Sequence, residues 1–274
     1  MAVCEVCFRH CDIEEGKTGA CRARSCRGGK VTADNYGRYT SLALDPIEKK
    51  PLARFYPGSY ILSYGSYGCN LFCPFCQNSD ISRSDGSEFE DVITPGHLAS
   101  LAEKYKVKGN IGVAFTYNEP LAGYEFVRDT AKIVHGMGMK NVLVSNGTAE
   151  LKILEEILPY IDAMNVDIKS FSEKTYREVL GGNLKMTKAF IERAVKDCHV
   201  ELTMLIVPGM NDSIEEMREV TGWIAGMSDE IPFHISRFFP RYKMSDKKPT
   251  EIGKIYMLAD IAREKLKFVY TGNC

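Results

Sequence analysis

The residues best suited to chemistry in this sequence are three cysteines in one short stretch. Cys69, Cys73 and Cys76 have the spacing C-x3-C-x2-C. A closed zinc site takes four protein ligands, and most 4Fe–4S clusters also take four cysteines. Three cysteines in one loop therefore predict a cluster with one iron left open for a further ligand. A zinc site whose fourth ligand lies elsewhere, or three buried free thiols, would also explain them.

A second set of cysteines falls in the first 26 residues. Four of them could ligate one metal centre: Cys4, Cys7, Cys11 and Cys21. Cys26 lies close by in the sequence. Thiolates bind both zinc and iron–sulfur clusters. The set therefore predicts a structural zinc or a second 4Fe–4S cluster, and the third alternative is that it binds no metal.

The composition is that of an ordinary soluble protein. The 274 residues are 45% hydrophobic and 26% charged, and the formal net charge is −1. This balance gives no electrostatic reason to expect a nucleic-acid or membrane partner. The N-terminus has no basic stretch followed by an apolar one, so we expect no signal peptide and a cytoplasmic location. In that reducing compartment, clustered cysteines bind metal more often than they form disulfides.

Two regions are expected along the chain, residues 1–58 and residues 59–274. The first is rich in cysteine, glycine and arginine and has no long apolar run. It has too little apolar surface for a core of its own, which predicts that a bound metal stabilises it. A small hairpin is expected there, with residues 30–35 pairing with 38–44 around Tyr36-Gly37.

The second region alternates strand and helix patterns. Strands are expected at 60–66, 110–117, 140–145, 163–167, 200–207 and 232–237, with a short seventh at 268–270. Helices are expected at 95–106, 121–135, 150–158, 172–180, 184–196, 213–227 and 251–265. Such alternation predicts an α/β fold with a parallel sheet. About six units in roughly 215 residues fall short of an eight-unit barrel. We therefore expect an open, partial (β/α)6 barrel, with a doubly wound sheet as the alternative.

Several motifs resemble those of a known family. The C-x3-C-x2-C spacing, with the aromatic Phe75 before Cys76, is the signature of the radical SAM superfamily. More narrowly, the stretches DPIEKKPL at residues 45–52 and CQN at 76–78 resemble the AmmeMemoRadiSam-system radical SAM enzymes. These are relatives of pyruvate formate-lyase activating enzyme. The resemblance implies a 4Fe–4S cluster whose open iron binds S-adenosylmethionine (SAM), and reductive cleavage of SAM to a 5′-deoxyadenosyl radical.

The resemblance also assigns roles to residues after the later strands, where a parallel barrel has its active site. Glu119, preceded by Asn118, takes the place of a motif that contacts the SAM amino group, although the two glycines of that motif are absent. A glutamate at the N-terminus of a helix is the structural alternative. The other residues expected to hold SAM are Phe75, Ser145, Asn146, Asp167, Lys169 and Val207. His234 and Arg237 are added because both fall at the end of one expected strand.

Simpler structural explanations exist for some of these residues. Asp167 and Lys169 could form only an ion pair. Val207 begins the stretch Val-Pro-Gly-Met-Asn-Asp, which could be only a turn and a helix cap. His234 could be a core histidine with satisfied hydrogen bonds.

The resemblance further implies an electron donor such as flavodoxin or ferredoxin, and a protein or small-molecule substrate. AMMECR1-like and Memo-like proteins are partners that it suggests. Activating enzymes of glycyl radical enzymes usually carry Gly-x-Arg before the cysteines, where this chain has Pro57-Gly58-Ser59. Two other functions remain open: a non-catalytic iron–sulfur or zinc protein, and an enzyme that uses SAM as a methyl donor.

Overall fold

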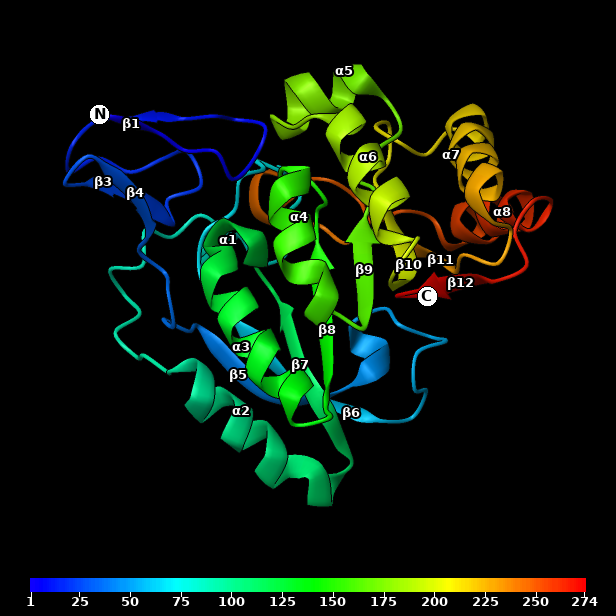
Figure 1. The fold of residues 1–274 in the computed structure, drawn as a ribbon. Helices are drawn as coiled ribbons and strands as arrows, with labels where there is room; N and C mark the ends of the chain where they lie inside the picture. The colour runs from blue at the N-terminus through cyan, green and yellow to red at the C-terminus, as the bar shows by residue number, and fades with distance from the viewer.

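One eight-stranded sheet organises the structure, a computed structural model that describes all 274 residues (Figure 1). Its strands follow one another in chain order without reversal, which makes the predicted partial barrel correct and the doubly wound sheet wrong. The first strand is antiparallel to the second and all others are parallel. The strands are β5 (Ser41–Pro46), β6 (Tyr60–Gly65), β7 (Asn110–Thr116), β8 (Lys140–Ser145), β9 (Ala163–Asp167), β10 (His199–Ile206), β11 (Phe233–Arg237) and β12 (Val269–Gly272).

The connecting helices lie along one face of the curved sheet (Figure 1). The longer ones are α2 (Pro95–Lys104), α3 (Tyr124–Gly136), α4 (Leu151–Ile157), α6 (Leu184–Ala194), α7 (Ile214–Met227) and α8 (Ile252–Arg263). Pro95 opens α2 after the cap Thr94, and Ser213 caps α7. The predicted helix at 172–180 forms as α5 (Glu173–Thr175) and a π turn (Tyr176–Leu180). None of the helices is both long enough and apolar enough to span a membrane.

The hairpin of the N-terminal segment differs from the predicted one. It pairs β3 (Arg24–Arg27) with β4 (Lys30–Ala33). Gly28 and Gly29 form its two-residue turn at φ +58° and +71°, the left-handed conformations that a type I′ turn requires. The predicted pairing of 30–35 with 38–44 is therefore wrong, because Gly-Gly turns the chain earlier and β5 pairs with β6 instead.

The rest of the N-terminal segment packs on the barrel. Its first strands are β1 (Ala2–Val3) and β2 (Asp12–Ile13), which pair with each other. Val6 and Ile13 belong to the same buried cluster as the barrel core. The backbone of Val6 accepts a hydrogen bond from Glu150 N, and Arg9 donates to the carbonyls of Asn70 and Gly181. The segment thus shares the barrel's core, and the domain boundary at residue 58 stays a prediction.

A buried carboxylate fixes the loop between β5 and β6 beneath the barrel. Glu201, fully buried on β10, accepts hydrogen bonds from the backbone N–H groups of Ala53 and Arg54 at 2.9 and 2.8 Å. It also pairs with the rings of His199 and His234 at 3.0 and 2.6 Å. Burial acts to raise the pKa of this carboxyl, but the hydrogen bonds outweigh it and lower the pKa to about 2.

We expect Glu201→Leu to lower the free energy of unfolding by about 3 to 5 kcal/mol, because four donors lose their charged partner in a buried place. Urea titration of protein of equal iron content measures it. Exposed Glu219 on α7 provides the control Glu219→Leu, with an expected change below about 0.5 kcal/mol. The contribution of Glu201 should be complete above its unfolded pKa of 4.5 and fade as the pH falls towards 2. Equal effects of the two substitutions would show that the Glu201 contacts carry no special stability.

Candidate active site

The carboxyl ends of the parallel strands open into one cleft of about 770 Å³. This volume lies in the range of sites that hold small molecules and cofactors. The cleft gathers most of the site residues predicted from the sequence: Cys69, Cys73, Phe75, Cys76, Asn118, Glu119, Ser145, Asn146, Asp167, Lys169 and His234. Val207 and Arg237 do not line it.

The cysteine loop follows β6 and is held by Asn118. The side chain of Asn118 accepts from Ser66 N at 3.1 Å and donates to the carbonyls of Tyr67 and Gly68 at 3.0 and 3.1 Å. Gly68 has φ +88°, and a Cβ there would come within 2.7 Å of Cys21 O. Asn118 therefore fixes the tight turn that places Cys69, although the sequence suggested it as a cofactor contact.

The three thiols of this loop are free and partly buried. Cys69 Sγ lies 3.5 Å from Leu71 N and 3.8 Å from Asn146 Nδ2. Burial raises the pKa of Cys73 to about 12 and raises that of Cys69 as well, so both thiols are protonated until a metal displaces the protons. Soft thiols beside N–H donors fit an iron–sulfur cluster. No three His, Cys, Asp or Glu side chains of the chain are placed to hold a metal ion.

Glu119 is a buried carboxylate between β7 and β8. Its Oε1 accepts from Ser145 Oγ at 2.8 Å and from Leu121 N at 3.1 Å, and its Oε2 accepts from Asn146 N at 2.8 Å. Burial raises its pKa to about 7, although these hydrogen bonds act to lower it. A carboxylate has about four acceptor positions. One position on Glu119 is thus left for a further donor.

Asp167 and Lys169 form an ion pair at the end of β9, with Nζ and Oδ2 2.7 Å apart. The backbone of Lys169 is fixed by Tyr176, whose hydroxyl accepts from its N–H at 3.2 Å, and by Asn211, whose Nδ2 donates to its carbonyl at 2.9 Å. The other end of the Asn211 amide accepts from Val207 N at 2.7 Å. The stretch from Val207 to Asp212 is therefore a turn that holds Lys169, as the structural alternative had it.

The remaining two predicted residues lie on β11. His234 is the second residue of β11, near its amino end, where it pairs with Glu201 and stacks on Tyr270. Arg237 donates to Thr250 O at 2.7 Å and packs over Phe239. Both have structural partners that account for their positions.

Sequence reasoning missed two further residues of the cleft, Lys50 and Tyr117. Both contact Asp45, with Lys50 Nζ at 2.8 Å and Tyr117 Oη at 2.5 Å from Oδ2. Although burial acts to raise it, these partners hold the pKa of Asp45 below its usual range. Burial raises the pKa of Tyr117 to about 12. Asp45 and Lys50 both belong to the DPIEKKPL stretch, so the sequence marked them as members of a family motif. No local pattern indicates that they contact Tyr117.

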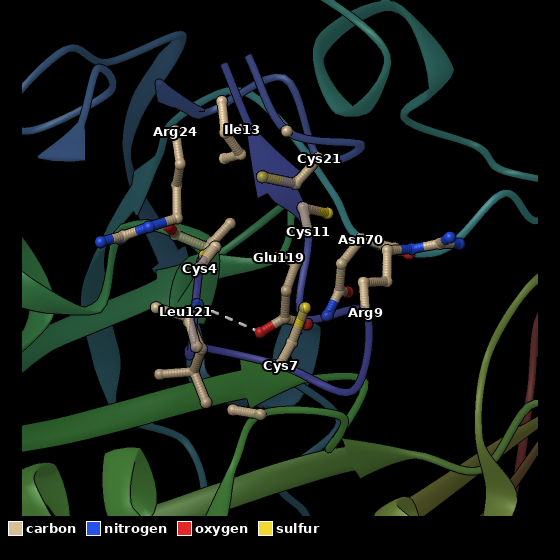
Figure 2. A pocket seen from close by; sticks show the side chains of 14 residues that line it. Cys4, Cys7, Arg9, Cys11, Ile13, Cys21, Arg24, Asn70, Glu119 and Leu121 are labelled. Carbon is tan, nitrogen blue, oxygen red and sulfur yellow. Dashed lines mark hydrogen bonds between the residues drawn. The ribbon is translucent and has the colours of Figure 1, made fainter. Parts of the chain in front are cut away.

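The N-terminal cysteines surround a second, more enclosed cavity beside the cleft (Figure 2). All four predicted ligands line it: Cys4, Cys7, Cys11 and Cys21. Cys26 does not, because its thiol turns to Glu15 at 3.6 Å. Glu119 lines both this cavity and the cleft, whereas Asn70 lines this cavity alone. The side chain of Glu119 therefore lies between the two cysteine sets.

Comparison with known proteins gives a family match over more than half of the chain. The family described as the radical SAM superfamily matches residues 63–221. An uncharacterized protein of Methanocaldococcus jannaschii is 39% identical over 98% of this chain and 80% of its own length. The 4-hydroxyphenylacetate decarboxylase activating enzyme of Clostridium scatologenes is 24% identical over 57% of this chain and 51% of its own. The chain thus spans about half the length of that activating enzyme.

Solved structures share the fold at low sequence identity. Streptococcus suis SuiB bound to S-adenosylmethionine matches with a TM-score of 0.61 at 14% identity, over 78% of this chain and 52% of its own. A domain of pyruvate-formate lyase-activating enzyme from Bacteroides vulgatus matches with a TM-score of 0.51 at 16% identity, over 59% of this chain and 98% of its own.

Proposed function

The chain belongs to the radical SAM superfamily, whose members use a 4Fe–4S cluster and SAM, and on that premise we propose that Cys69, Cys73 and Cys76 ligate the cluster. The observation that carries this proposal is the common cleft, which places the three thiols beside the polar ends of β7, β8 and β9. Once bound and reduced, the cluster supplies the electron that breaks a C–S bond of SAM. The residues of the chain bind and orient SAM and exclude water from the cleft.

The polar groups around the thiols match the two charged ends of SAM. The open acceptor position of Glu119 suits the amino group, and the ammonium of Lys169 suits the carboxylate. Asn146 reaches Cys69 Sγ and Asn70 and so fixes the cluster loop against β8. Ser145 orients Glu119 rather than facing SAM.

The proposed reaction is hydrogen abstraction by the 5′-deoxyadenosyl radical, with a protein as the favoured substrate. The activating enzymes among its relatives support a protein substrate and an external reductant such as flavodoxin or ferredoxin. Because the chain lacks the Gly-x-Arg stretch, we do not propose a glycyl radical enzyme as the protein substrate. The stretches DPIEKKPL and CQN support the narrower assignment to the AmmeMemoRadiSam system, with AMMECR1-like and Memo-like partners.

Formation of 5′-deoxyadenosine tests the proposal. Anaerobically reconstituted, dithionite-reduced protein should release it from SAM, because solvent or buffer can quench the radical even without the true substrate. Mass spectrometry measures the product. The variant Cys69→Ala/Cys73→Ala/Cys76→Ala should yield none, while Cys198→Ala, a thiol next to the amino end of β10, should match the wild type.

Protein with a verified, reducible cluster that yields no 5′-deoxyadenosine would contradict the proposal, provided that the assay also includes candidate partner proteins. The non-catalytic alternative, an iron–sulfur or zinc binding protein, predicts that result.

The contact of Glu119 with the SAM amino group predicts a pH-dependent affinity. The carboxyl loses its charge as the pH falls through about 7, so the dissociation constant of SAM should rise severalfold between pH 8 and pH 6. Isothermal titration of cluster-loaded protein measures it. Glu119→Gln should bind weakly and without this pH dependence, whereas Glu48→Gln, on the exposed rim, should behave as the wild type. A dependence that persists in Glu119→Gln would assign it to another group.

A further inference from the structure

We propose that Cys4, Cys7, Cys11 and Cys21 bind a second 4Fe–4S cluster, separate from the one in the cleft. The four side chains point into one enclosed cavity from different parts of the N-terminal segment (Figure 2). Its remaining lining is mainly apolar: Val6, Ile13, Leu121, Ala122 and Ala149. Converging free thiols in such a place are suited to a metal centre. This inference does not depend on the proposed reaction.

The structure also selects which cysteines take part. Cys26, the fifth cysteine of the segment, is fully buried in β3 but faces away from the cavity and contacts Glu15 Oε2. Four thiolates remain, the number that a fully ligated 4Fe–4S cluster requires. Such a cluster has no open iron, unlike the one proposed for the cleft.

A buried arginine next to the cavity has a donor without a partner. Arg24 is 4% exposed, and its terminal nitrogens bind Glu125 at 2.6 and 2.9 Å and the carbonyl of Ala122 at 3.0 Å. Its Nε has no hydrogen-bond acceptor. Arg24 lines the cavity close to Cys4 and Cys21. The sulfur atoms of a bound cluster would supply the missing acceptor, and the guanidinium would offset their negative charge.

The placement of the thiols favours a cluster over zinc. A zinc ion holds four sulfurs about 2.3 Å from one point, so the thiols of a zinc site crowd together. Here the sulfurs are spread around a cavity (Figure 2), and no three of the cysteines are placed to hold one ion. Cys69, Cys73 and Cys76 are likewise not placed to hold one ion, and the cofactor of their family is a 4Fe–4S cluster.

The second cluster would lie directly behind the first. Cys69 N donates to Cys21 O at 3.2 Å, and the side chain of Glu119 lines both sites. Arg9 ties the same segment to the cluster loop through Asn70 O at 2.7 Å. A cluster on the N-terminal cysteines would thus fix the backbone that presents Cys69.

Metal content in the absence of the cleft ligands tests the inference. The variant Cys69→Ala/Cys73→Ala/Cys76→Ala is reconstituted anaerobically with iron and sulfide, and iron, sulfide and zinc are counted per chain. About four iron and four sulfide are expected, with the Mössbauer signature of a 4Fe–4S cluster. In that background, Cys7→Ala/Cys11→Ala should remove the cluster and Cys26→Ala should retain it. Circular dichroism checks that each variant is folded.

The wild type gives the same answer without any substitution, so a misfolded variant does not block the test. Its expected content is about eight iron per chain. About four iron and one zinc per chain, or loss of all iron in the variant without cleft ligands while it stays folded, would overturn the second cluster. Iron that survives Cys7→Ala/Cys11→Ala would be adventitious and would overturn it too.

Discussion

The buried carboxylate of Glu119 is the contact on which the site depends. It joins the end of β7 to Ser145 and Asn146 at the end of β8, and its side chain borders both cysteine sets. Burial of such a group is unfavourable unless its oxygens are hydrogen-bonded. Three donors satisfy all but one of its acceptor positions, so one position remains for a further donor.

Contacts on two sides of the barrel stabilise the strands around Glu119. Beneath it, Glu201 on β10 binds the backbone of Ala53 and Arg54 and so closes the barrel with the loop after β5. Above it, the N-terminal segment packs against Gly68, where only a glycine fits beneath Cys21 O. The cysteine loop is therefore backed by the first residues of the chain. This arrangement explains why a segment without its own core can still be ordered.

The sequence predicted what depends on local pattern. Strand and helix periodicity gave the partial barrel, and placing Cys69, Glu119, Asn146 and Lys169 after successive parallel strands was enough to predict a shared cleft. Local pattern could not predict contacts between residues far apart in the sequence. Arg237 donates a hydrogen bond to Thr250 O, and the ammonium of Lys50 packs over the ring of Tyr117. The hairpin is a different case, because its turn signal, Gly28-Gly29 with both φ angles positive, is local to the sequence.

The central claim is that the cluster on Cys69, Cys73 and Cys76 keeps one iron open for SAM. Electron–nuclear double resonance of the reduced protein, mixed with SAM labelled with ¹⁵N at its amino group, tests it most directly. The account predicts a hyperfine coupling from that nitrogen, present in the wild type and absent from Cys69→Ala/Cys73→Ala/Cys76→Ala. A reduced cluster in the wild type that shows no such coupling with SAM in excess would contradict it.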